Sequence, residues 1–235
     1  MCRDTFCSMA PKKIIKDNAY FDKKYYTRNN FFEVLTKGGY VKSNNKAHVG
    51  VTVKWKIPFM LSYLEKKKGA LLDIGCGMCY FLRAVPKGFG CYGVDVSKYA
   101  ITESKKQNKK FSLKVADITK KIPFSKKFDV ITAFDTMEHI EKLDDCFANV
   151  KKALAKDGLF FMEVPIKTKF HLFISLFGLG LLHNDPTHIH KEDIEWWIKK
   201  AKKYFEIVDA KKVLFENVAV PGLAISGLLV LKAKK

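Results

Sequence analysis

The feature that most constrains the fold is a short apolar run that ends in a glycine-rich turn. Residues 71–79 read LLDIGCGMC, in which one glycine stands on each side of the small side chain of Cys76. This pattern predicts a buried strand that enters a tight turn, where the lack of a Cβ lets a ligand approach the backbone. A second apolar run, CYGVD, ends in Asp95, 20 residues after Gly75. A carboxylate at the tip of the neighbouring strand can accept hydrogen bonds from both hydroxyls of a ribose, so the two features together predict a nucleoside site.

Strand-like runs alternate with helix-like segments along most of the chain. Alternation of this kind indicates a parallel sheet covered on both faces, with its ligand crevice at the carboxyl ends of the first two strands. The predicted fold class is α/β: a Rossmann-like, doubly wound, mostly parallel seven-stranded sheet with an antiparallel C-terminal strand. We expect strands at 70–74, 90–95, 111–116, 128–134, 158–164, 205–214 and 224–231, and helices at 55–67, 98–108 and 138–155 and from Ile194.

The glycine turn does not fit a dinucleotide site. That fingerprint needs a third glycine where this chain has Tyr80, and it does not include an acidic residue two positions before the first glycine. The turn DIGCG together with Asp95 resembles the class I S-adenosylmethionine (SAM)-dependent methyltransferases, with Cys79 in place of their usual third glycine. Further segments resemble that family in the same order: VADIT with IPF, FDVITAFDTMEHI, LAKDGLFFMEVP, and DPTHIH before the last large helix.

The resemblance implies that SAM is the cofactor. In that family the glycine turn packs under the methionine part of SAM, the second acidic residue (Asp95 here) holds the ribose, and an aspartate corresponding to Asp117 meets the adenine amino group. The cofactor-binding residues that it implies are Asp73, Gly75, Cys76, Gly77, Asp95, Val96, Asp117, Ile118, Phe134 and Asp135.

His188 and His139 are the candidate catalytic residues. Methyl transfer needs a base only when the acceptor arrives protonated, and an imidazole titrates near neutral pH. His188 lies in a segment that rims the acceptor pocket in related enzymes, although it could instead hydrogen-bond a loop and shape a lid.

The pattern Asp135-x-x-Glu138-His139 has two interpretations. A similar pattern in the ubiquinone-pathway O-methyltransferases is thought to hold a divalent metal near the acceptor. The same spacing is also a capping box, in which Asp135 and Glu138 accept hydrogen bonds from the free amides at a helix start. We favour the cap, and therefore expect no metal.

Composition favours a single domain whose cysteines are reduced thiols. The 235 residues suffice for a single domain with a full core. The six cysteines form no disulfide framework, which favours the cytoplasm, and the lone C-x-x-C of Cys76 and Cys79 has no second pair to complete a zinc site. No stretch approaches the roughly 18 to 20 apolar residues that a membrane span needs.

The formal net charge of +19 could steer the chain to RNA, DNA or an anionic membrane surface. The basic residues are spread along the chain and almost all are lysine, whereas arginine is the preferred residue for bidentate phosphate recognition. We therefore favour a lysine-rich solvated surface and keep RNA as a possible partner.

Two parts of the chain have open interpretations. We expect an N-terminal tail and aromatic flap at 1–50, and a methyltransferase domain at 51–235 with an apolar lid insertion at 166–190. The aromatic segment YFDKKYY, residues 20–26, either covers the cofactor cleft or fastens the N-terminus to the core. The insertion is an acceptor-site lid, a homodimer contact, a surface for a lipid-like substrate, or simply packed within the fold.

The expected function is SAM-dependent methyl transfer to a small or lipid-like acceptor, at oxygen. The alternatives are an RNA methyltransferase and a non-catalytic, nucleoside-binding scaffold subunit.

Overall fold

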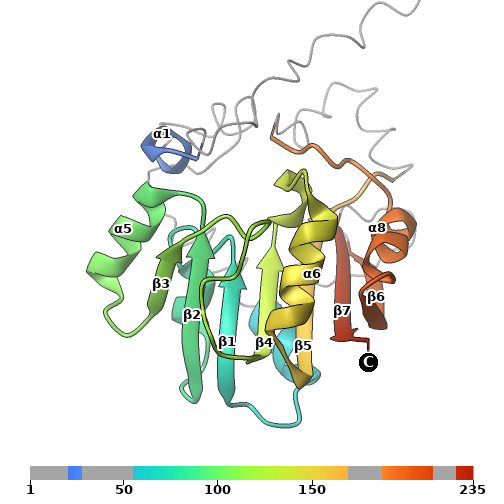
Figure 1. Ribbon diagram of the computed structural model, residues 1–235, viewed down its shortest axis with the longest axis horizontal. Coiled ribbons are helices and arrows are strands. Elements are labelled where there is room, and N and C mark those ends of the chain that lie inside the picture. Colours follow the sequence, from blue (N-terminus) through green and yellow to red (C-terminus); the bar gives the residue numbers. More distant parts are fainter. Residues whose placement is uncertain (1–20, 28–54, 169–186, 214–225, 235) are drawn as a thin grey trace, which may run out of the picture.

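The computed structural model describes residues 21–27, 55–168, 187–213 and 226–234. Its centre is a seven-stranded sheet in the order β3-β2-β1-β4-β5-β7-β6 (Figure 1). The strands from β3 to β5 pair in parallel, while β7 pairs antiparallel to both β5 and β6. The predicted fold class is confirmed. The strands are β1 (Gly69–Ile74), β2 (Phe89–Asp95), β3 (Ser112–Val115), β4 (Phe128–Phe134), β5 (Leu154–Pro165), β6 (Phe205–Val213) and β7 (Ser226–Ala233).

Helices cover both faces of the sheet. In the view of Figure 1, α6 and α8 lie in front of it, and the helical residues 55–62 lie behind it. The helices with defined bounds are α1 (Lys23–Tyr26), α4 (Tyr80–Ala84), α5 (Lys98–Gln107), the 3-10 helix η2 (Met137–His139), α6 (Leu143–Ala153) and α8 (Ile194–Ala201). In the part of the chain that the structure describes, no helix is both long and apolar enough to cross a membrane.

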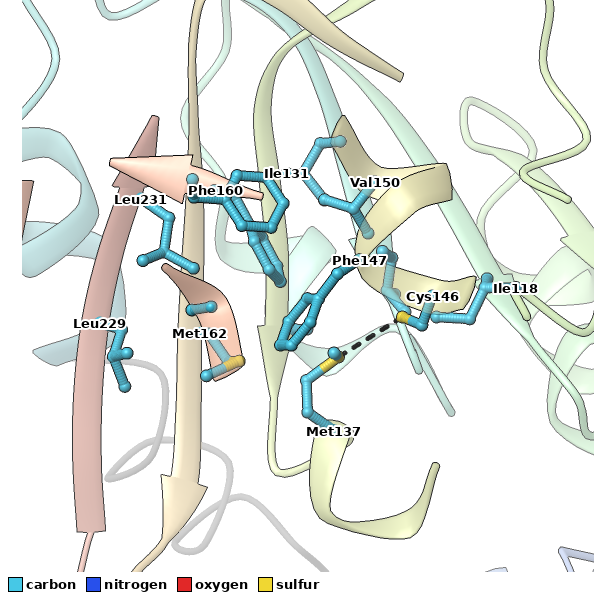
Figure 2. Close-up of a cluster of buried hydrophobic side chains, with 14 of the residues drawn as sticks. Ile118, Ile131, Met137, Cys146, Phe147, Val150, Phe160, Met162, Leu229 and Leu231 are labelled. Atoms are coloured by element: carbon cyan, nitrogen blue, oxygen red, sulfur yellow. Dashed lines mark hydrogen bonds between the residues drawn. The ribbon is translucent and has the colours of Figure 1, made fainter. Parts of the chain in front are cut away.

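The two faces of the sheet bury two separate cores. Alternate residues of a strand point to opposite faces, so Phe160 and Met162 enter one core while Phe161 enters the other. Figure 2 shows the first core, where Phe147 and Val150 of α6 pack against the sheet. Because the central strands are buried on both faces, they read as continuous apolar runs, which is why their positions could be predicted.

The predicted helix at 138–155 is wrong at both ends. The chain forms the short η2 first, and Ile140 is extended, with φ −97° and ψ 110°, before α6 begins at Leu143. The backbone carbonyl of Glu138 accepts hydrogen bonds from the amides of Ile189 and His190, at 3.0 and 3.2 Å, instead of continuing a helix. At the other end Leu154 already pairs with Phe128 in the sheet.

Parts of the predicted domain layout lie outside the described residues. These are the tail at 1–20, the segment 28–54 and most of the 166–190 insertion, from 169 to 186. Of the predicted aromatic flap, the structure describes Phe21 to Tyr26, together with Thr27.

Candidate functional site

The glycine turn and Asp95 meet at the carboxyl end of the sheet. Gly75 and Gly77 have φ values of 69° and 46°, a left-handed conformation that favours glycine. The amide of Gly77 donates a hydrogen bond to Oδ2 of Asp95, at 2.8 Å. Cys79 also has a positive φ, 59°, which explains why related turns usually carry a glycine at that position. The bend and the distant carboxylate therefore lie side by side, as the nucleoside prediction requires.

The two glycines of the turn have different surroundings. A Cβ on Gly75 would collide with the side chain of Thr136, so this glycine lets the ends of β1 and β4 approach each other. A Cβ on Gly77 would lie 3.4 Å from the ring of Tyr26. The first glycine is thus required by the protein's own packing, and the second lies beneath the side chain of Tyr26, which also contacts Asp95.

Asp95 is a buried carboxylate with three donors. It is 7% exposed and accepts hydrogen bonds from the amides of Ser97 and Gly77 and from the side chain of Tyr26. Burial raises the pKa of Asp95 above its ordinary value, against the effect of these three hydrogen bonds. Ser97 also caps α5, since its Oγ accepts from the amide of Ala100 at 3.1 Å. The carboxylate is therefore held in one orientation by the start of a helix.

The other predicted cofactor residues surround this point at different depths. Asp117, after β3, accepts hydrogen bonds from both the amide and the hydroxyl of Thr119. Ile118 is buried in the first core and lies beside Cys146 of α6 (Figure 2), so its side chain serves packing. Cys76 is likewise buried, and Val96 and Phe134 are half-buried.

Asp73 lies inside the sheet. It is buried, and its Oδ1 accepts a hydrogen bond from the hydroxyl of Thr132 at 2.7 Å. Burial raises the pKa of Asp73 to about 7, while the Thr132 hydrogen bond and the charge of Lys56 oppose the rise. Asp73 therefore links β1 to β4 directly before the glycine turn.

Asp135 belongs to a buried ion cluster that the sequence did not reveal. Nζ of Lys56 lies 3.0 Å from Oδ2 of Asp135 and 2.8 Å from Oε2 of Glu163. The Lys56 and Glu163 side chains are 5% and 8% exposed, whereas that of Asp135 is 54% exposed. The cluster thus joins the helical residues 55–62 to the ends of β4 and β5 and presents one carboxylate outward.

The charged groups in this cluster shift one another's pKa values. Desolvation opposes the charged form of each group, but the two carboxylates raise the pKa of Lys56 and Lys56 lowers that of Asp135. Burial raises the pKa of Glu163 to about 7, against the pull of Lys56. Lys56 and Asp135 are therefore the ionised pair, and Glu163 titrates near neutral pH.

The capping-box interpretation is wrong. The residue before η2 is Thr136, no side chain caps the helix, and Asp135 is turned toward Lys56. The set of metal ligands that the resemblance suggests, Asp135, Glu138 and His139, also differs from the group that the structure brings together, because Asp135 is not part of that group. That group, within the described residues, is Glu138, His139 and His188, whose ligand atoms all lie within 4.8 Å of one another.

His139 and His188 meet over a buried carboxylate. Oε1 of Glu138 lies 3.7 Å from Nε2 of each histidine, and the ring centroids are 4.8 Å apart. Nδ1 of His139 lies 3.1 Å from the carbonyl oxygen of Thr187. The hydroxyl of Thr187 lies closer to the same nitrogen, at 2.9 Å, and can either donate or accept, so these contacts are compatible with both neutral tautomers of His139. The three side chains could accept a proton or hold a divalent cation.

The segment Phe21–Tyr26 reaches both parts of the site. Tyr26 hydrogen-bonds Asp95, and the ring of Phe21 lies 5.7 Å from that of His139, edge to face. In Figure 1, α1 lies beyond the carboxyl end of β2, next to α5. The structure therefore brings the predicted nucleoside and catalytic residues under one aromatic segment.

Sequence reasoning missed Lys56 and Glu163, and saw Glu138 only as a cap or ligand. Glu163 had a signal, since it is a charged residue in the apolar run FFMEVP and must find a partner when buried. Lys56 had none, because it lies 107 positions before Glu163 among many other lysines.

Comparisons with known proteins agree with this geometry. Residues 50–202, more than half of the chain, match the family described as Methyltransferase domain. The chain is 32% identical over 148 residues to a ubiquinone biosynthesis O-methyltransferase of Pelagibacter ubique, covering 60% of this chain and 59% of that protein. It is also 32% identical over 120 residues to squalene methyltransferase 2 of Botryococcus braunii, covering 47% of this chain and 32% of that protein. The chain thus spans less than two thirds of the length of either relative.

A solved structure shares the fold. The PH0226 protein from Pyrococcus horikoshii OT3 aligns with a TM-score of 0.65 at 22% identity, over 88% of this chain and 98% of that one.

Proposed function

We propose that this chain transfers a methyl group to an oxygen atom of a small or lipid-like acceptor. The premise is that the chain belongs to the methyltransferase domain family of class I SAM-dependent enzymes. SAM is the cofactor of this class. The observation that supports the proposal is the 2.8 Å hydrogen bond from the Gly77 amide to Asp95, because a carboxylate held beside the glycine turn is suited to accept the hydroxyls of a ribose.

The cofactor residues have distinct roles in this proposal. Asp95 accepts the ribose hydroxyls, and Asp117, at the end of the adjacent strand, receives the adenine amino group. Gly75, Cys76 and Gly77 line the turn under the methionine part. Asp73 supports that turn from inside the sheet, and Val96 and Phe134 pack around the nucleoside. Ile118 supports the adenine end from the first core, and the outward carboxylate of Asp135 faces the methionine end.

Methyl transfer requires the protein mainly to position the acceptor and to supply a base for its proton. Bound SAM supplies a methyl group on a positively charged sulfur. The chain must hold the acceptor oxygen in line with it, about 3 Å away, and exclude water. His188 or His139 takes the acceptor's proton, and the buried carboxylate of Glu138, 3.7 Å from Nε2 of each ring, stabilises the cationic ring that forms.

The choice of acceptor is supported by the named relatives and by the base. One relative is named for O-methylation in ubiquinone biosynthesis and supports an oxygen acceptor. The other is named for squalene, a hydrocarbon, and supports only a lipid-like acceptor. A phenol or hydroxyl acceptor must lose a proton, and a histidine pair over a carboxylate is suited to remove it. Oxygen therefore fits the site better than an unactivated carbon.

The test is calorimetry followed by a transfer assay. The full chain should bind S-adenosylhomocysteine (SAH), and it should move labelled methyl from SAM to a pool of phenolic, lipid-tailed compounds. Absence of SAH binding removes the proposal. Binding without transfer to any pool favours the scaffold alternative, and salt-sensitive transfer to RNA favours the alternative that the net charge of +19 supports.

The cytoplasm remains our proposed location, supported by the free thiols of Cys76, Cys79, Cys91 and Cys146 in the described residues. The tail and flap at 1–50, the domain at 51–235, the lid at 166–190 and a homodimer remain predictions.

A further inference from the structure

Tyr26 lies where the cofactor's ribose should bind. It hydrogen-bonds Asp95, the residue that we assign to the ribose, and its ring lies over Gly77. Both tyrosines of α1 are buried, although the helix is only four residues long. The N-terminal aromatic segment therefore covers the turn and uses the same carboxylate as the ligand would.

The lone pairs of Asp95 cannot serve every donor at once. A carboxylate offers about four lone-pair sites in total. Two are taken by the amides of Gly77 and Ser97, which belong to the backbone of the site and stay in place. Tyr26 takes a third. A ribose that donates both hydroxyls needs two, so one donor must leave, and only Tyr26 is on a separate element.

The contacts of α1 are compatible with its displacement from the glycine turn. Tyr25 and Tyr26 pack in a small cluster of their own with Ala100, apart from the two cores of the sheet. The partly buried neighbours in that cluster are Phe21, Met78 and Tyr99. Removing α1 from this place therefore leaves both large cores intact.

We propose that α1 is a gate on the cofactor site: Tyr26 occupies the ribose position of Asp95 and must be displaced before SAM binds. The same movement carries Phe21 away from His139, because the two aromatic residues are on one short segment. Cofactor binding thus opens the acceptor side of the site. This inference rests on the proposed function.

The first test measures the affinity for SAH in the full chain and in Tyr26→Phe. The substitution keeps the ring and removes the competing hydroxyl, so SAH should bind about 3- to 10-fold more tightly, the range of one hydrogen bond. Tyr25→Phe, a change to the adjacent buried tyrosine of α1, is the matched control and should leave the affinity unchanged. Damage to the fold would weaken binding, so a gain in affinity is specific to competition.

The second test follows the movement itself. Lys23 and Lys24 of α1 are exposed and are trypsin sites. Saturating SAH should speed cleavage after these two lysines, measured by mass spectrometry, while cleavage after Lys126, an exposed lysine in the bend before β4, should keep its rate. Tyr26→Phe should show the faster cleavage without ligand.

The outcomes separate the two proposals. SAH binding with equal or weaker affinity in Tyr26→Phe, or unchanged or slower cleavage at Lys23 and Lys24 with SAH, overturns the gate and leaves the proposed function standing. No SAH binding by either protein overturns both.

Discussion

The amide of Gly77 donates to Oδ2 of Asp95 across 18 positions of the chain, at 2.8 Å. This one hydrogen bond joins the turn after β1 to the tip of β2. Since both strands are parallel and adjacent, the contact follows from the topology of the sheet.

Asp95→Ala should weaken SAH binding by about 1 to 3 kcal/mol, because the ribose hydroxyls lose a charged acceptor. Isothermal titration calorimetry measures the change. Asp157→Ala, which removes a carboxylate that is 80% exposed on β5, is the control and should not alter affinity. Equal affinities for Asp95→Ala and the unchanged chain would contradict the ribose assignment.

His188→Ala should lower kcat by about 10²- to 10⁴-fold with SAH affinity unchanged, because it removes a base and no cofactor contact. The rate is measured at saturating SAM with the acceptor found in the transfer assay. His190→Ala controls for disturbance of the same segment, since Nε2 of His190 lies 2.9 Å from the carbonyl of Ile140. Parallel loss of rate and SAH affinity in His188→Ala would assign it a structural role.

Removal of metal should leave the rate unchanged if Glu138, His139 and His188 move protons. The chain is dialysed against a chelator and then assayed with and without added Mg²⁺ or Zn²⁺. A rate that is lost on dialysis and restored by one of the cations would assign these three side chains to a metal centre instead.

Lys56→Met should destabilise the fold by about 3 to 5 kcal/mol, because it leaves buried Glu163 and the partner Asp135 without their cation. Urea unfolding measures the free energy. Lys232→Met is the control: Lys232 is 39% exposed, and its pair with Asp157 lies at the surface, so we expect a change of about 0 to 1 kcal/mol. Similar losses of unfolding free energy in both variants would show that the buried cluster stabilises the fold no more than a surface ion pair does.

The free energy of unfolding should fall as pH rises from about 4 to about 7. The pKa of Asp73 is raised from 3.8 to about 7 in the folded state, so the folded chain keeps a proton that the unfolded chain releases in this window. Glu163, raised from 4.5 to about 7, acts with the same sign, whereas the lowered pKa of Asp135 acts only in more acidic solution. Asp73→Asn should make the fall shallower, as measured by urea unfolding at a series of pH values. An equal slope in both proteins would show that Asp73 does not titrate there.

Local patterns were enough to predict the sheet and the approach of the glycine turn to Asp95. Each central strand is a continuous apolar run bounded by polar residues, and the glycine turn and Asp95 each end such a run. Only the order of the elements was then needed to bring them together.

The arrangement of Glu138, His139 and His188 could not be predicted in the same way, because long-range contacts define it. The break between η2 and α6 depends on hydrogen bonds to Glu138 from Ile189 and His190, some fifty positions away. The pairing of His139 with His188 depends on the same contacts, so local spacing suggested a helix cap instead.

Within the part of the chain that the structure describes, β6 pairs only with β7, although β7 is synthesised later and lies between β6 and β5. During synthesis on the ribosome, β6 therefore has no place to dock until β7 has emerged, and β5 keeps a bare edge for the same interval. Unpaired strand edges promote aggregation. The nascent chain is thus most vulnerable just before β7 inserts, and a chaperone that shields β5 and β6 at that moment should raise the yield of folded protein.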